Sequence, residues 1–195
     1  LGAGGPAVAL HLRGTAWEGG GLFRLARDLR SPAEDSGALL LVNDRVDVAL
    51  AVDLSGVHLG QRSLPSHVTR GLLGSDRLLG VSVHREREAE EAGGSPDYLV
   101  AGTLFATASH PGGVPGGVGR IREIRGVTRL PLVGIGGISP ARVFQVLAAG
   151  AHGVAVRGGI WNSPDPATAV GVFLERIEDW RNFAGAPLEP DGRAG

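Results

Sequence analysis

The feature that most constrains the fold of this chain is a repeated alternation of short apolar runs with amphipathic segments. Runs of this length without polar alternation are typical of strands buried on both faces of a parallel sheet. Seven such runs, rich in Val, Leu and Ile, recur at 7–12, 38–42, 56–59, 78–83, 98–102, 130–136 and 153–156. One run and the segment after it together take about 20–25 residues, which is the period of a βα unit.

Four of the intervening segments have the pattern of amphipathic helices. They lie at 20–30, 85–93, 139–150 and 165–183. In the third, Ser139 is the predicted N-cap, Pro140 occupies the first turn and Gly150 ends the helix. The last carries one apolar stripe that we expect to face the core, made of Val170, Phe173, Leu174, Ile177 and Trp180.

The βα repeat favours an α/β fold of the (β/α)₈ TIM barrel type. Such a barrel has eight strands and typically about 250 residues, although compact barrels are shorter. We predict one barrel domain over residues 1–195, with the first strand missing ahead of Leu1, because seven strands are visible and the chain contains no methionine. The alternative is an open doubly wound sheet. Its G-x-G-x-x-G fingerprint is absent after the first strand, and "GIGGIS" comes only at 134–139.

Composition excludes several classes of function. The chain has 19 basic and 20 acidic residues, and no block of one charge predicts binding to nucleic acid. It has no cysteine, which excludes disulfides, thiolate nucleophiles and Cys-ligated zinc. No apolar run reaches the roughly 18 residues that a membrane span requires. We therefore expect a cytoplasmic protein that binds neither nucleic acid nor membranes.

Glycine-bearing turns follow the last two predicted strands. In a barrel, the functional groups lie on the loops after the strands, and phosphate often binds after the last two. Glycine lets backbone N–H groups approach an anion closely. We therefore predict a phosphate site from Gly136, Gly137, Arg157 and Gly158.

Five segments together resemble, in order and spacing, the thiamine phosphate synthase superfamily, which includes the TenI-type thiazole tautomerases. They are "LLVNDRVDVALAVDLSGVHLGQRSLP" (40–65), "LLGVSVH" (78–84), "DYLVAGTLFATASHPG" (97–112), "LPLVGIGGI" (130–138) and "AGAHGVAVRGGI" (149–160). The resemblance implies a barrel that binds a thiazole phosphate, a small-molecule substrate, in thiamine biosynthesis. It also implies substrate-binding roles for Arg13, Asn43, Asp44, Thr107 and Ser109.

The resemblance also shows where this chain departs from a synthase, which joins a pyrimidine pyrophosphate to a thiazole phosphate with Mg²⁺. The family's second acidic metal ligand is replaced by Ser63. Two of its lysines are replaced by Thr15, in "HLRGT" at 11–15, and by His110. Because electrostatic stabilisation is the main service of such a site, these replacements favour the tautomerase-like branch, a metal-independent isomerase.

A proton shift needs a base whose pKa is near neutral, and histidine is the usual choice. Our candidates for catalytic residues are His110 and His11, because Thr103 stands where the tautomerase group has its histidine. We predict no cofactor and no metal ligand; Mg²⁺ enters only with the synthase alternative. A non-catalytic regulator that binds thiazole or thiamine phosphate is a third interpretation.

Three further residues or segments have open interpretations. His58 lies in "GVHLG", where a structural role in holding the neighbouring loops competes with substrate contact. Asp44 and Arg45 form an ion pair in one interpretation. The aromatic segment 180–183 is expected to pack in the core, with a homodimer contact as the alternative.

Overall fold

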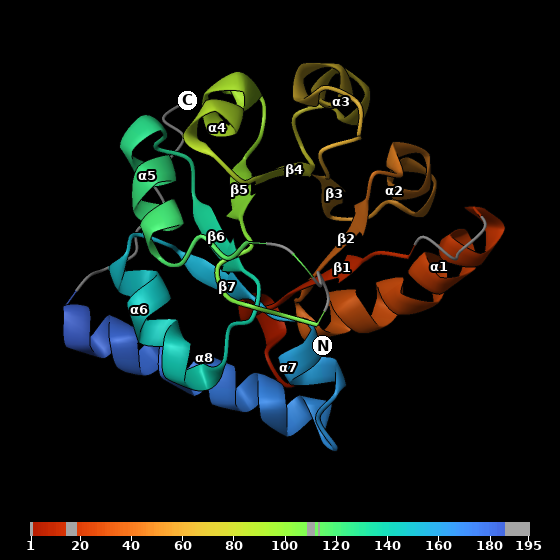
Figure 1. Ribbon diagram of the computed structural model, residues 1–195. Helices are drawn as coiled ribbons and strands as arrows, with labels where there is room; N and C mark the ends of the chain where they lie inside the picture. Colours follow the sequence, from red (N-terminus) through yellow and green to blue (C-terminus); the bar gives the residue numbers. More distant parts are fainter. Residues whose placement is uncertain (1, 15–18, 109–111, 113, 186–195) are drawn as a thin grey trace.

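A computed structural model describes residues 2–14, 19–108, 112 and 114–185. Its centre is a parallel sheet in which each strand pairs with the next along the chain, in the order β1 to β7 (Figure 1). The strands are β1 (Ala9–Leu12), β2 (Leu39–Asn43), β3 (Gly56–Leu59), β4 (Leu78–Val83), β5 (Tyr98–Ala101), β6 (Leu132–Ile135) and β7 (Gly153–Ala155). All seven lie within two residues of the predicted runs.

Helices cover the outer face of the curled sheet (Figure 1). They are α1 (Gly19–Ser36), α2 (Val46–Val52), α3 (Ser66–Leu73), α4 (Glu86–Ala92), α5 (Gly119–Val127), α6 (Val143–Ala148), α7 (Gly158–Trp161) and α8 (Pro166–Ala184), with short 3₁₀ turns η1 (Gly5–Ala7) and η2 (Pro140–Arg142). The doubly wound alternative is wrong, because the sequential strand order never reverses. The described residues form an α/β fold with a curled, parallel sheet of seven strands, in which β1 and β7 are the edge strands.

The helix boundaries differ from the prediction where local signals are weak. Helix α1 continues through Pro32 to Ser36, whose hydroxyl donates to the Pro32 and Ala33 carbonyls. Segment 139–150 divides into η2 and α6; Ser139 occupies the N-cap position, but its side chain makes no capping hydrogen bond. In α8 the predicted stripe does reach the core, since Phe173 is buried and Ile177 and Trp180 pack against the same cluster.

The hydrophobic core lies between the sheet and its helices. Alternate strand residues point outward, and they form two clusters, one around Leu40, Val42 and Val57 and one around Leu99 and Leu132. The other set of residues points into the curl of the sheet and includes polar side chains of β1, β3, β4 and β5. Within the described residues, no helix is long and apolar enough to cross a bilayer.

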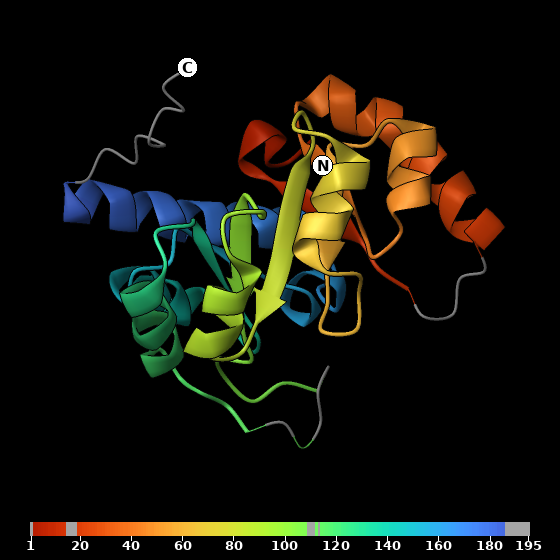
Figure 2. The ribbon, with the colours of Figure 1, turned by 90° about the horizontal axis from the view of Figure 1, so that it is seen from above.

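Parallel strands bring all their carboxyl ends to one edge of the sheet. Figure 2 shows this edge at the bottom of the view, where the segment after β5 and helix α7 lie. The residues predicted to bind substrate follow β1, β2, β5, β6 and β7, so the topology places all of those that are described at this edge.

Candidate functional site

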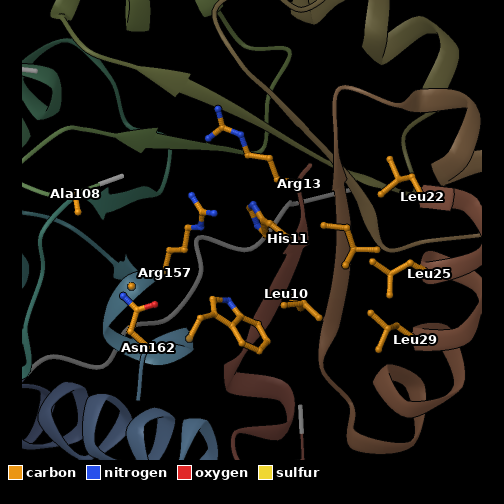
Figure 3. A pocket seen from close by; sticks show the side chains of 12 residues that line it. Leu10, His11, Arg13, Leu22, Leu25, Leu29, Ala108, Arg157 and Asn162 are labelled. Carbon is orange, nitrogen blue, oxygen red and sulfur yellow. The ribbon is translucent and has the colours of Figure 1, made fainter. Parts of the chain in front are cut away.

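A pocket of about 610 Å³ opens beside β1, between helix α1 and helix α7. One side is apolar and consists of leucines from β1 and α1 (Figure 3). The other side is polar, and Figure 3 shows four labelled side chains there: His11, Arg13, Arg157 and Asn162. Of the predicted site residues, this pocket therefore brings together His11, Arg13, Arg157 and Gly158.

Two guanidinium groups, those of Arg13 and Arg157, are exposed at this pocket. Arg13 follows the last residue of β1, and Arg157 precedes the first turn of α7. Among the described residues neither forms an ion pair with a carboxylate. Arginine binds phosphate oxygens through paired N–H donors, so the pocket has the chemistry of an anion site.

Asp44 presents a carboxylate directly after β2. Its backbone is in the left-handed region, with a φ of 64°. Its Oδ1 accepts hydrogen bonds from the Ser63 hydroxyl and from the Gly60 N–H, the latter at 3.1 Å. Its Oδ2 accepts none from any described residue. The predicted Asp44–Arg45 ion pair is wrong: Arg45 pairs with Asp47, because the left-handed turn directs the Asp44 carboxylate toward the loop after β3 instead.

The turn after β6 is formed by Gly136 and Gly137, with φ values of 105° and 61°. The segment after β5 packs directly against it, since the Phe105 N–H donates to the Gly136 carbonyl at 3.0 Å. Arg142 donates to the Gly137 carbonyl at 2.6 Å and stacks over the Phe105 ring. These contacts fix the glycine turn that was predicted to bind phosphate.

The remaining predicted residues are placed as follows. Asn43 is the last residue of β2 and lies beside His58 of β3 in the sheet register. Thr107 is half-buried in the segment after β5. Ser109 and His110 lie outside the described residues, as does Thr15.

Four polar side chains form a cluster inside the curl of the sheet: His11, His58, Ser82 and Tyr98. The sequence did not single out Ser82 or Tyr98. The Tyr98 hydroxyl lies 3.4 Å from His11 Nε2 and 3.4 Å from His58 Nδ1. His58 Nε2 lies 2.8 Å from the Ser82 hydroxyl. Successive side chains of a strand point to opposite faces, so Ser82 in β4 and Tyr98 in β5 both fall on the inner face.

Burial perturbs all three rings of this cluster. It lowers the pKa of His11 to about 4. Burial, together with the positive charges of His11 and Arg13, lowers the pKa of His58 to about 3, although Asp44 acts in the opposite direction. Burial raises the pKa of the Tyr98 phenol. Burial therefore keeps His11 neutral at pH 7 and makes it a weaker base than an ordinary imidazole.

A second pocket, of about 330 Å³, lies between the loop after β3 and helix α4. Ser63 and Ser82 line it together with Gln61 and Glu88. Gln61 donates to the Ser82 carbonyl at 2.8 Å and to Glu88 at 3.1 Å. Among the described residues, no three His, Asp or Glu side chains converge on a metal site.

Comparison with known proteins identifies the family. The sequence pattern of the family described as thiamine monophosphate synthase matches residues 2–160. The thiamine-phosphate synthase of Moorella thermoacetica is 44% identical over 85% of this chain and 80% of its own length, and that of Laribacter hongkongensis is 42% identical over 85% and 78%. The chain spans less than half of another such synthase, from Synechococcus, at 44% identity.

Solved structures give the same answer. The thiamine phosphate pyrophosphorylase of Pyrococcus furiosus superimposes with a TM-score of 0.82 at 32% identity, over 92% of this chain and 87% of that one. A 3-hexulose-6-phosphate synthase, with a TM-score of 0.68 at 15% identity, shares the fold alone.

These relatives overturn the predicted tautomerase-like isomerase, because the Moorella and Laribacter proteins, at 44% and 42% identity, are both named thiamine-phosphate synthase. The prediction gave too much weight to the missing acid and lysines: Mg²⁺ is often bound by one or two carboxylates together with substrate phosphates, so Ser63 is compatible with a synthase. The chain belongs to the thiamine monophosphate synthase family.

Proposed function

We propose that the chain is a thiamine-phosphate synthase, a transferase that joins a pyrimidine pyrophosphate to a thiazole phosphate and releases pyrophosphate. The observation that carries this proposal is the pair of exposed guanidinium groups, Arg13 and Arg157, on one pocket at the strand ends. Two phosphate-bearing substrates require such cations, and a metal-free proton shift has less need of them. The names of the relatives favour the same reaction.

The pyrophosphate end of the site is assigned to Arg13 and Asp44. Arg13 would grip phosphate oxygens through its planar donors. Mg²⁺ is the cofactor implied by this reaction, and the residues present fit it: one carboxylate oxygen of Asp44 has no donor among the described residues, and the Ser63 hydroxyl lies on the other oxygen. Mg²⁺ would neutralise the leaving pyrophosphate, and substrate oxygens would complete its coordination.

The thiazole-phosphate end is assigned to the opposite side of the same edge. Gly136, Gly137 and Gly158 would offer backbone N–H groups, and Arg157 would add a charge. Asn43 and Thr107 are proposed to contact the substrates, as are Ser109 and His110. His11 is proposed as a neutral hydrogen-bonding group on the pocket wall, in place of its predicted role as a base.

The finer fold is also a proposal. An eighth strand between β7 and β1 would complete the (β/α)₈ barrel. The apolar wall of the 610 Å³ pocket, which includes Leu10, Leu22, Leu25 and Leu29, favours this arrangement, because a further βα unit would cover these side chains.

The deciding experiment supplies the purified chain with the pyrimidine pyrophosphate, the thiazole phosphate and Mg²⁺. We expect thiamine phosphate and pyrophosphate in equal amounts, with a rate that rises with Mg²⁺ and disappears with EDTA. Ser63→Asp places a second carboxylate beside Asp44 and should lower the Mg²⁺ concentration required for half-maximal rate. Thiazole phosphate binding by calorimetry, without product at any Mg²⁺ concentration, would refute the synthase activity.

A further inference from the structure

The polar cluster inside the curl of the sheet connects the two pockets. His11 lines the larger pocket, and Ser82 lines the smaller one. Between them, His58 and Tyr98 are in contact, with ring centroids 5.8 Å apart. We call the chain of four side chains the relay: Ser82, His58, Tyr98 and His11.

The sheet leaves a gap for the relay to cross β4. His58 of β3 and Tyr98 of β5 both lie in register with Gly80, the residue between them. A Cβ atom at position 80 would be 2.1 Å from Tyr98 Cζ and 2.6 Å from His58 Nδ1, which is closer than atoms can approach. The absence of a side chain at Gly80 therefore allows the phenol and the imidazole to meet across the strand.

The number of protons limits how the relay can be hydrogen-bonded. Each neutral imidazole carries one N–H, and each hydroxyl carries one proton. If Ser82 donates to His58 Nε2, the proton of His58 is on Nδ1 and points to the Tyr98 oxygen. Tyr98 then donates to His11 Nε2, and the His11 proton is on Nδ1.

The opposite direction is equally complete. His11 then donates from Nε2 to Tyr98, Tyr98 donates to His58 Nδ1, and His58 donates from Nε2 to Ser82. Any arrangement in which the two imidazoles differ breaks one of the three links or leaves the phenol proton without an acceptor in the described part of the chain. An unsatisfied buried polar group costs about 1–3 kcal/mol.

We infer that the relay couples the two pockets by holding both imidazoles in the same tautomer, either both Nδ1–H or both Nε2–H. In the first state His11 Nδ1 is a donor toward the larger pocket, and the Ser82 hydroxyl donates to His58. In the second state His11 Nδ1 is an acceptor, and Ser82 accepts from His58, which leaves its own proton free to donate elsewhere. Tyr98 and His58 are thus positioning residues that act through His11. Any effect on turnover rests on the proposed function, whereas the coupling itself does not.

The surroundings of the relay favour neutral rings with a fixed proton. His58 is buried, and in the described part of the chain neither imidazole of the relay forms an ion pair with a carboxylate. A neutral ring that is hydrogen-bonded at both nitrogens has a tautomer set by its partners. The same logic provides an internal reference: His152 Nδ1 lies 3.2 Å from the Leu132 N–H and must accept that bond, so its proton is on Nε2.

The test is nitrogen-15 NMR of the imidazoles in the whole chain, without substrates. Two-bond proton–nitrogen correlations distinguish the two tautomers. We expect His11 and His58 to show the same tautomer. We expect Ser82→Ala to shift the His11 nitrogens, with which Ser82 makes no direct hydrogen bond, and Ser82→Thr to restore them, because it keeps the hydroxyl. His152 should not move in either variant.

Tyr98→Phe removes the central oxygen and little else. In that background, Ser82→Ala should no longer shift the His11 nitrogens. Different tautomers in the parent, an unchanged His11 in Ser82→Ala, or an undiminished response in the double variant would each overturn the relay. If Tyr98→Phe does not fold, the Ser82 pair decides the matter alone. The NMR experiment contains no substrate, so a negative result would refute the relay without bearing on the proposed synthase activity. A negative synthase assay would likewise leave the relay unaffected.

Discussion

The two ends of the candidate site are constructed differently. At β1–β3, the proposed functional groups are side chains: the Arg13 guanidinium, the Asp44 carboxylate and the Ser63 hydroxyl, the last two hydrogen-bonded to each other. At β6, the surface proposed to bind phosphate is backbone, shaped by Gly136 and Gly137 and fixed by contacts from Phe105 and Arg142. Where side chains supply the chemistry, a single substitution can change it. Where backbone N–H groups supply it, a substitution acts only by changing the conformation of the turn.

This difference explains why the predicted tautomerase-like function was wrong. The replacements at Ser63, Thr15 and His110 all concern side chains that the family uses for charge, and we took them as loss of synthase chemistry. The structure places the Ser63 hydroxyl on one oxygen of Asp44 and leaves the other oxygen without a donor among the described residues. Such compensation depends on which side chains meet in space, and spacing along the chain does not reveal it.

The largest expected effect is at the side-chain end. Asp44→Asn removes the carboxylate but keeps a residue that tolerates a positive φ, so the turn should persist. Loss of one such electrostatic group typically costs about 10²–10³ in rate, and we expect a loss of this size in product formation at saturating substrates. Asp47→Asn, at the exposed partner of Arg45, is the matched control. A variant with near-normal activity would remove Asp44 from the metal site.

At the backbone end, Gly136→Ala should act through the turn. Position 136 has a φ of 105°, and a Cβ there would be 2.6 Å from Thr103 Cγ2 and 3.1 Å from the Leu104 nitrogen. Such strain costs on the order of 1–3 kcal/mol, so the urea midpoint should fall together with affinity for thiazole phosphate. Gly158→Ala is the control, because its Cβ meets only the Asn162 side chain, at 3.5 Å. Equal midpoints for the two variants would contradict this account.

Substitutions of Arg13 and Arg157 test whether the two ends of the site bind different substrates. Arg157→Gln should raise the KM for thiazole phosphate by about tenfold, the equivalent of 1.4 kcal/mol, and leave the KM for the pyrimidine pyrophosphate nearly unchanged. Arg13→Gln should do the reverse. Arg122→Gln, on the exposed side of α5, controls for loss of a positive charge. If both variants raise both KM values equally, the proposed division of the site into two ends is wrong.

The fold was far easier to predict than the site. Strands 56–59 and 78–83 are short, mostly apolar runs, and the structure places them at the same residues. Helices α2, α3, α5 and α7 were missed because they are short and carry Gly or uniform apolar residues in place of a long stripe. Tyr98 escaped notice because its meaning depends on Gly80, one strand away, which only the register of the sheet brings beside it.

The last prediction concerns the His11 imidazole and the pH dependence of folding stability. Its pKa is lowered to about 4 in the folded chain, against about 6.5 when unfolded. Between these values the unfolded chain binds a proton that the folded chain does not, so His11 costs stability as pH falls from 6.5 toward 4. His11→Gln should reduce the slope of unfolding free energy against pH by at most about 1.4 kcal/mol per pH unit in that window.

Urea titrations at steps of half a pH unit would measure this slope, and above pH 7.5 the curves of the parent and the variant should run parallel. If the two curves also ran parallel between pH 4 and 6.5, His11 would titrate as a solvated imidazole. Water would then reach the His11 ring at the side-chain end of the site.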